Sequence, residues 1–525
     1  MKQILHRGAA WVKAHPKIDI AVLVAGLFIF ALVTLFHVSS ASIWFDEAFS
    51  AYIIRFDYWQ IAAFTSTDVH PPFYYWALKL WSDLFGTTEL ALRSLSIVFA
   101  IGAISGAFIL MRRLFGRSVA AVSLLFMVLS PMIVRYSDEA RMYTLATLIV
   151  VWATYVLVRA IQAKNQKRWW VAYAVLVALG MWTHYFTAFV WLAHWAWRGI
   201  VVAQKNKEVK AFAKAYFTKS WLWVHVLAVG LFVPWLFFMV KQLGTVQGSG
   251  FWIGPVGVDT PVNYLTNIFY YLEHGKTQSW IALLIVTVIA LVIILIPKTY
   301  RRLRADSRQS FWLVSVVAFV PPILLFLSSL PPLRPSFVDR YLIPSILFYS
   351  LFMAVVFVVG TRSWRPIARV LPIILVSGMM IFGISNVYYY GNYNKNSNTH
   401  ILTRQVINEI KRVGGEGQPI VANSPWLLYE AAPYESADHP VYFIDENTQY
   451  IFGSLDMLKE SDLHKISDLD AFEKANPVIW YFGATTDADV TPYRDDWRKI
   501  QTVSVTSPIT GKTVYRATAY QVSAE

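Results

Sequence analysis

Eleven apolar runs, each about 20 residues long, limit what this sequence can fold into, because that length is what an α-helix needs to cross the core of a bilayer. Of the 525 residues, 56% are hydrophobic and 15% charged, a composition that excludes a soluble globule. The sequence therefore predicts an all-α polytopic membrane protein. The expected spans lie near residues 18–38, 90–111, 118–135, 143–161, 169–183, 186–203, 220–240, 279–297, 311–330, 341–360 and 367–388.

The connections between these runs predict the orientation of the chain. Basic connections, such as Arg112 to Arg117 and Lys298 to Arg308, alternate with connections that are poor in Lys and Arg. The positive-inside rule then predicts a cytoplasmic N-terminus and, after an odd number of spans, an extracytoplasmic C-terminus in a multi-pass protein of the plasma membrane. The first apolar run follows basic residues but is longer than a secretory signal core, so a retained anchor is expected rather than a cleaved signal peptide.

The formal net charge of +14 does not indicate nucleic-acid binding once it is divided along the chain. Residues 1–388 hold 34 Lys and Arg against 14 Asp and Glu, whereas residues 389–525 hold 12 against 18. The first part is predicted to be a transmembrane domain and the second a soluble extracytoplasmic domain. A helical pattern at 403–413, short buried strands near 419–422, 441–444 and 478–482, a helix at 469–475 and a final hairpin predict a small α/β fold there.

Two long outer connections separate the spans. Residues 39–89 are amphipathic and predict one or two helices that lie along the interface. Residues 241–276 are rich in Gly and then aromatic, which fits either a mobile lid or a slack linker. The chain has no cysteine, so thiolate catalysis and Cys-ligated metals are excluded.

Polar clusters stand next to the predicted outer ends of the spans. Asp46 and Glu47 follow the first span and could provide a general base, or Asp46 could cap the helix that follows. His70 precedes Pro71-Pro72 and could hold a phosphate, or the prolines could only begin a helix. The remaining candidates for substrate binding are Asp138, Glu139, Arg141 and Tyr143, Arg340, and, with a weaker signal, His184 and Tyr185.

Arg141 and Arg340 are the candidates for binding a lipid phosphate. Arg141 is expected at the outer start of the fourth span, where a guanidinium can grip a phosphate with two parallel hydrogen bonds. An ion pair with Asp138 is the structural alternative. Arg340 stands at the start of the tenth span. Carboxylates beside cations at headgroup depth suit an anionic, lipid-linked substrate.

These motifs resemble the polyprenyl-phosphate-dependent glycosyltransferases of the GT-C fold, in particular family 39, which includes the protein mannosyltransferases and the aminoarabinose transferases. The resemblance is sharpest at Phe45-Asp46-Glu47-Ala48, His70-Pro71-Pro72-Phe73-Tyr74 and Asp138-Glu139-Ala140-Arg141-Met142-Tyr143.

The resemblance implies inverting transfer of a sugar from a polyprenyl-phosphate donor to a glycan, lipid or protein acceptor on the extracytoplasmic face. Asp46 would be the base, Glu47 would orient the acceptor or hold the donor sugar, and Arg141, His70 and Arg340 would bind the donor phosphate. The sequence departs from the aminoarabinose transferases, which have an Arg soon after the Asp-Glu pair and a Lys before Pro-Pro.

No cofactor and no metal are expected, because cationic side chains can neutralise a phosphate leaving group. Two other classes of membrane protein are also compatible with many spans and with cations at headgroup depth. A flippase for a lipid-linked glycan predicts charges midway through the spans, which are scarce here. A non-catalytic membrane scaffold predicts that Asp46 and Arg141 tolerate substitution.

Overall fold

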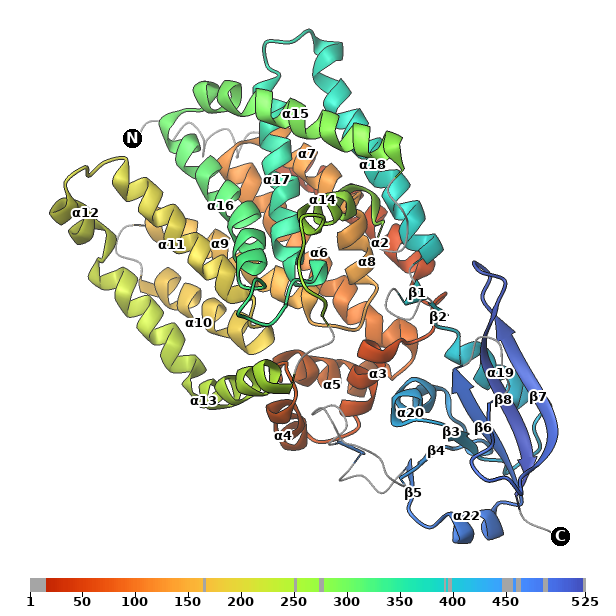
Figure 1. Cartoon of the computed structure of the whole chain (residues 1–525). Helices are drawn as coiled ribbons and strands as arrows, with labels where there is room; N and C mark the ends of the chain where they lie inside the picture. Colours follow the sequence, from red (N-terminus) through yellow and green to blue (C-terminus); the bar gives the residue numbers. More distant parts are fainter. Residues whose placement is uncertain are drawn as a thin grey trace.

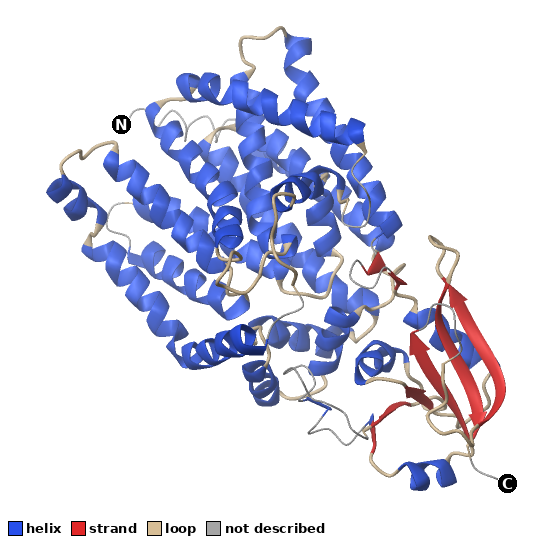
Figure 2. Cartoon of the chain, viewed as in Figure 1, coloured by secondary structure: helices blue, strands red, loops and turns tan. Residues whose placement is uncertain are grey.

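The computed structural model describes residues 16–163, 167–249, 253–272, 278–390, 393–394, 399–445, 457–458, 464–484 and 490–522. A large bundle of helices forms most of the molecule, and a smaller module of strands and helices, from α19 to β8, lies against one end of it (Figures 1 and 2). We call the smaller part the C-terminal module.

Every predicted span coincides with a helix or a broken helix. Eight described helices are long and apolar enough to cross a membrane, and nine are if a bent pair counts as one span. Two more, α10 and α11, have 17 residues each, at the short end of what a span requires. The helices of the bundle are α2 (Pro16–His37), α6 (Glu89–Leu114), α7 (Arg117–Val128), α8 (Pro131–Ser137), α9 (Tyr143–Gln162), α10 (Lys167–Thr183), α11 (Thr187–Ala203), α12 (Val209–Tyr216), α13 (Lys219–Ser249), α15 (Ser279–Arg302), α16 (Ala305–Leu327), η1 (Asp339–Leu342), α17 (Ile343–Gly360) and α18 (Pro366–Tyr390).

The third predicted span is two helices instead of one. The axes of α7 and α8 differ by 58°. Proline disfavours helical backbone at the residue before it, and Ser130 is extended, with φ −68° and ψ 115°, immediately before Pro131. The Ser130 side chain then accepts a hydrogen bond from the backbone N–H of Ile133 and begins α8 as a new helix.

Helix α17 forms the centre of the bundle (Figure 1). In its apolar stretch 94% of residues are buried, and it packs against α7, α9, α15 and α16. An apolar helix buried on all sides is expected at the core of a large helical bundle. The short helix η1, which contains Arg340, leads directly into α17, so one of the predicted phosphate-binding residues lies just before the most buried helix.

The first long connection contains three helices, α3 (Phe45–Ile53), α4 (Tyr58–Thr67) and α5 (Phe73–Phe85). They lie together at the end of the bundle that faces the C-terminal module (Figure 1). The boundaries follow local signals: Asp57 and Gln60 form a capping box at the start of α4, and α5 begins after Pro71-Pro72.

The second long connection is more ordered than a slack linker. Helix α13 continues to Ser249, and α14 (Thr260–Tyr270) buries Ile268 and Phe269. The amide of Asn267 donates to the carboxylate of Asp339 at 2.5 Å, which ties α14 to η1. The linker interpretation is therefore wrong for residues 260–270, whereas residues 250–252 and 273–277 lie outside the described part of the chain.

The C-terminal module has the predicted α/β character. Its six-stranded sheet has the order β5-β4-β3-β6-β8-β7, with parallel pairing from β5 to β6 and antiparallel pairing of β8 with β6 and β7. The expected strands, the helix at 469–475 and the hairpin are confirmed, while α20 was not predicted. Before the module, β1 (Tyr393–Asn394) and β2 (Thr399–His400) pair with each other in a separate two-stranded sheet. The elements of the module are α19 (Thr403–Val413), β3 (Ile420–Ala422), α20 (Pro425–Ala431), η2 (Ala432–Tyr434), β4 (Val441–Ile444), β5 (Lys465–Ile466), α22 (Leu469–Ala475), β6 (Val478–Ala484), β7 (Arg498–Thr506) and β8 (Thr513–Gln521).

Candidate active site

Asp46 lies in the first turn of α3, two residues after the chain leaves the loop that follows α2. Its side chain does not cap the helix: the N-cap is Trp44, and no side-chain hydrogen bond is made there. The capping alternative for Asp46 is therefore wrong. The carboxylate is 21% exposed, the partial access that a base acting on a bound substrate needs.

Arg340 forms an ion pair with Asp46. Its Nη2 atom lies 3.2 Å from Oδ2 of Asp46, and its guanidinium carbon lies 5.5 Å from the centre of the Trp44 ring. Residues from the first outer connection and from η1 thus meet, although almost 300 positions separate them in the sequence.

Arg141 lies on the other side of the Asp46 backbone. Its Nη1 atom donates to the carbonyl of Asp46 at 3.0 Å, to the hydroxyl of Tyr75 at 3.1 Å and to Ser50 Oγ at 3.4 Å. The side chain is 3% exposed, and its Nε atom has no hydrogen-bond partner in the described part of the chain. A buried cation with a donor still unused can accept an anionic ligand without losing an existing bond. No ion pair with Asp138 is formed.

Glu47 points away from Asp46 into the protein. Both of its carboxylate oxygens accept from Arg93, at 2.8 and 2.6 Å, and one also accepts from the backbone N–H of Ala140 at 2.9 Å. Glu47 is 1% and Arg93 2% exposed. This buried pair joins α3, α6 and the turn before α9. Glu47 and Arg93 also line a small cavity, which they share with Trp44.

His70 lies at the entry to α5 and contacts Asp68. Its Nδ1 atom is 3.3 Å from Oδ2 of Asp68, and its ring centre is 6.1 Å from that of His184. Burial lowers the pKa of His70, and the contact with Asp68 opposes that effect. Because a carboxylate only accepts, the proton of the neutral ring stands on Nδ1 and the Nε2 atom is left as an acceptor.

Asp138 and Glu139 lie in the turn between α8 and α9. Glu139 is fully buried and pairs with Arg135 at 3.0 Å, and burial raises its pKa to about 7. Asp138 lies 3.9 Å from His37, and burial raises its pKa. Asp138 and His37 line a small cavity together with Trp44. This cavity lies beside the candidate site, on the Trp44 side of the Asp46–Arg340 pair.

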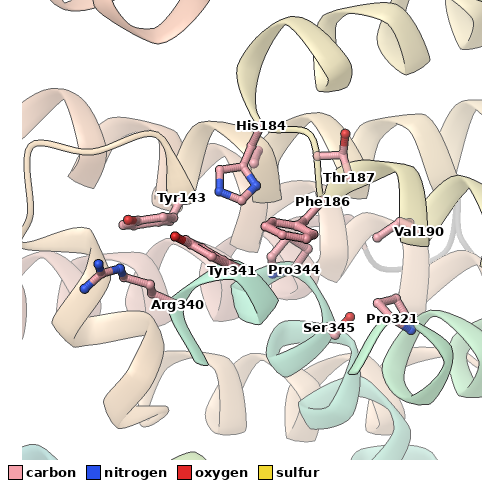
Figure 3. Close-up of a pocket in the computed structure, with 11 residues that line it drawn as sticks. Tyr143, His184, Phe186, Thr187, Val190, Pro321, Arg340, Tyr341, Pro344 and Ser345 are labelled. Atoms are coloured by element: carbon pink, nitrogen blue, oxygen red, sulfur yellow. The ribbon is translucent and has the colours of Figure 1, made fainter. Parts of the chain in front are cut away.

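A second cavity begins at Arg340 and continues between α9, α11, α16 and α17 (Figure 3). It is narrow: the space inside it that the centre of a water-sized molecule can occupy is about 10 Å³. Its polar end carries Arg340, Tyr341, Tyr143 and His184, and its other end is lined by apolar side chains, among them Val190 and Pro321 (Figure 3). A cation at the mouth and an apolar wall beyond it are what an amphipathic lipid phosphate requires.

Tyr143 and His184 are part of this cavity, but Tyr185 is not. The rings of Tyr143 and His184 lie 5.9 Å apart, and that of Tyr341 is 4.9 Å from His184. Burial lowers the pKa of His184 well below its usual range, with the nearby cations adding to the effect. The hydroxyl of Tyr185 instead donates to Gln242 at 2.5 Å and joins the end of α13 to the bundle.

The structure therefore brings together Asp46, Arg141, His70, Arg340, Tyr143 and His184. Sequence reasoning missed Arg93, because a single charge one turn into a long apolar run was read as part of a span. An isolated charge in such an apolar run requires a partner, and this requirement is the sequence signal that points to Arg93. Tyr75 and Ser50 were also missed. The described residues contain no group of three His, Asp or Glu side chains placed to hold a metal ion.

Residues 69–238 match the family model of dolichyl-phosphate-mannose-protein mannosyltransferases. No protein with a curated description matches the chain by sequence. Among solved structures, ArnT from Cupriavidus metallidurans in the apo state is 13% identical, with a TM-score of 0.57 over 97% of this chain and 98% of that one. The same protein bound to undecaprenyl phosphate gives 13% identity and a TM-score of 0.56 over 96% and 98%. The expected GT-C fold with its C-terminal module is thereby confirmed.

Proposed function

We propose that the protein is an integral membrane glycosyltransferase that transfers a sugar from a polyprenyl-phosphate donor to an acceptor hydroxyl. The observation that carries this proposal is the position of Asp46: its carboxylate pairs with Arg340 at 3.2 Å, and Arg340 also stands at the mouth of a cavity with an apolar far end. A base, a phosphate-binding cation and a place for a lipid tail are thus adjacent. The family match over residues 69–238 and the fold support the same class of reaction.

The donor is proposed to lie with its phosphate between Arg340 and Arg141. Arg141 has an unused Nε donor, and Arg340 faces the cavity. The first prenyl units would follow the apolar wall made by Val190, Pro321 and Pro344. His70 would complete the phosphate site from the other side, through its free Nε2 atom in the protonated form.

The transfer step is a single displacement at the anomeric carbon. Asp46 takes the proton of the acceptor hydroxyl, the acceptor oxygen bonds to the anomeric carbon, and the bond from that carbon to the phosphate oxygen breaks. The electron pair of the broken bond leaves with polyprenyl phosphate, whose added charge Arg141 and Arg340 neutralise. Attack from the face opposite the leaving group inverts the anomeric configuration. Preorganised cations of this kind are the main source of stabilisation for a developing anion.

We further propose that the reaction needs no metal, because these two guanidinium groups neutralise the phosphate directly.

The acceptor is a glycan, lipid or protein on the extracytoplasmic face. The candidate residues lie at or beside the last turns of α2 and α8 and the first turns of α6, α9 and α17. These helix ends all lie on one side of the bundle. The opposite ends carry basic residues, of which Arg112 and Arg117 pair with Asp19 at 2.9 and 2.6 Å. The positive-inside rule assigns that basic side to the cytoplasm.

The test is sugar transfer by the purified protein in proteoliposomes that contain labelled polyprenyl-phosphate sugars and lipid, glycan or peptide acceptors. We expect transfer that persists in chelator and is lost in Arg340→Ala. Arg365→Ala, at an exposed cation in the turn between α17 and α18, is the matched control and should keep full activity. A wild-type protein that carries labelled lipid across the bilayer without forming a new glycosidic bond would instead be a flippase, and one that does neither would be a scaffold.

A further inference from the structure

The loop that joins α2 to α3 is held by two arginines from different parts of the chain. Arg93 of α6 donates to the carbonyls of Val38, Ala41 and Ser42, at 2.6, 2.9 and 3.1 Å. Arg404 of α19 donates to those of Ser39 and Ser40, at 2.8 and 3.0 Å. Every carbonyl from residue 38 to residue 42 therefore accepts from a guanidinium. Five consecutive loop carbonyls bound in this way fix the path of the backbone just before Asp46.

Arg404 is itself fixed by a small network at the junction of the bundle and the C-terminal module. Its guanidinium pairs with Glu89 at the start of α6, and the hydroxyl of Tyr434 donates to the same carboxylate. Tyr434 also accepts from the backbone N–H of Ile43 at 2.7 Å. The Ser42 hydroxyl donates to Gln405 at 2.8 Å. Contacts from the C-terminal module thus reach from residue 39 to residue 43.

Helix α3 lies between this module and the candidate active site. On one side, the ring of Phe45 packs 4.8 Å from Trp426 and that of Tyr52 4.9 Å from Tyr429, both on α20. On the other side, the backbone carbonyl of Asp46 accepts from Arg141. A shift of the module relative to the bundle would therefore move the helix that carries the carboxylate.

We propose that the C-terminal module is a positioning element for Asp46, and that Arg404 is its principal positioning residue, with Tyr434 in support. This inference rests on the proposed function of Asp46 as the base. Arg404 does not reach the reacting atoms; it acts through the loop of residues 38–43. Because displacement of a reacting group by about 1 Å can cost about a hundredfold in rate, a loosened loop lowers turnover without removing the binding site for the donor phosphate.

The first test compares Arg404→Ala with Arg412→Ala. Both residues lie on α19, but Arg412 is exposed, and its ion pair within the described part of the chain is with Glu409, three residues earlier on the same helix. We expect Arg404→Ala to lower kcat by ten- to a hundredfold while donor affinity changes less than threefold. Arg412→Ala should match the wild type. Arg404→Lys should recover part of kcat, because one ammonium can serve some of the carbonyls.

The second test reads the loop directly. The chain has no cysteine, so Ser39→Cys, at an exposed loop position, accepts a single spin label. We expect the label to become more mobile in Arg404→Ala and in the milder Tyr434→Phe, and to stay as in the wild type in Arg412→Ala. Tyr434→Phe keeps the aromatic packing and therefore serves if Arg404→Ala does not fold.

The outcomes separate this inference from the proposed function. An unchanged spectrum and wild-type turnover in both Arg404→Ala and Tyr434→Phe, together with an inactive Asp46→Asn, overturn the positioning role and leave the transferase proposal standing. If the wild type transfers no sugar to any acceptor, the proposed function fails and the positioning role of Arg404 fails with it, whatever the label shows. A fall in donor affinity equal to the fall in kcat also contradicts positioning.

Discussion

Arg141 donates from Nη1 to the backbone carbonyl of Asp46, so the predicted phosphate-binding cation and the predicted base are joined by one hydrogen bond of 3.0 Å. The contact uses the main chain of Asp46 and leaves its carboxylate to Arg340. The backbone of Asp46 and its carboxylate are therefore each bound by a different arginine.

Replacement of this cation should slow the chemical step. Arg141→Lys keeps the charge but loses the planar guanidinium that binds Asp46 and Tyr75 and that is proposed to bind the donor phosphate, so we expect kcat to fall by about 10². The measurement is single-turnover transfer from a labelled donor. The exposed Arg365 supplies the control, as Arg365→Lys. Turnover in Arg141→Lys within a factor of three of the wild type would show that no transition-state charge is stabilised there.

His70 should make donor binding depend on pH. Burial lowers the pKa of His70 in the free protein, so the ring is neutral near pH 7. The phosphate charge of the donor favours the protonated ring, so binding takes up a proton, and affinity rises as the pH falls through neutrality. We expect donor affinity to be about tenfold weaker at pH 8 than at pH 6. The phosphodiester of the donor has no second proton to lose in this range.

The matched variant for this experiment is His70→Asn, which keeps a polar side chain but cannot be protonated. Its donor dissociation constant should be the same at both pH values. A wild-type donor affinity that does not change with pH contradicts the account. So does a donor affinity that still depends on pH in His70→Asn.

The buried ion pair of Glu47 and Arg93 should contribute mainly to the free energy of unfolding rather than to the rate of sugar transfer. Glu47→Gln leaves a buried guanidinium with a neutral partner, and breaking a buried pair costs about 3–5 kcal/mol. Thermal unfolding in detergent should show a large drop in midpoint. Glu409→Gln, which removes the exposed pair with Arg412, should change the free energy by less than about 1 kcal/mol. Similar unfolding midpoints for the two variants would mean that the buried pair stabilises the protein no more than the exposed pair does.

Glu430 should make the C-terminal module less stable as the pH rises. Burial raises its pKa to about 7 in the folded protein, whereas its ordinary value is 4.5, and the hydroxyls of Thr403 and Tyr515 only partly oppose this. The protonated acid therefore stabilises the fold. That contribution is complete below pH 4.5, falls between 4.5 and 7, and is lost above 7. The difference between the two pKa values corresponds to a loss of about 3 kcal/mol in the free energy of unfolding between pH 4.5 and pH 7.

Hydrogen exchange of strand β6 measures this effect in the intact protein, after correction for the intrinsic pH dependence of exchange. Protection should decrease from pH 5 to pH 8 in the wild type and stay level in Glu430→Gln, which carries no titrating group. A wild-type protection factor that rises over this range has the wrong sign for a buried acid and would refute the assignment to Glu430.

The sequence predicted the spans and most of the candidate site because both depend on local patterns. Asp46, Arg141 and Arg340 each stand at a predicted outer span end, so the topology alone placed them on one side. What it could not supply was the direction of each side chain: Glu47 follows Asp46 directly, yet one helix position turns it by about 100° into the contact with Arg93. The contribution of Arg404, from a separate module, is a long-range contact that no local pattern encodes.

The break in the third span had a local signal, Ser130-Pro131, which the length of the apolar run concealed. Helix α14 was missed for the opposite reason: the glycines before it suggested a linker, while the helix itself begins only at Thr260 and is stabilised by burial of Ile268 and Phe269. Tertiary packing, rather than local composition, decides whether such a segment is helical.

The most direct test of the central claim separates donor binding from transfer in Asp46→Asn. Asparagine keeps the shape of the side chain but cannot take the proton of the acceptor. The account predicts a donor dissociation constant within about threefold of the wild-type value and a loss of turnover of about 10²–10⁴, the range expected for removal of a general base. Turnover in Asp46→Asn close to that of the wild type, with the donor bound normally, would contradict it.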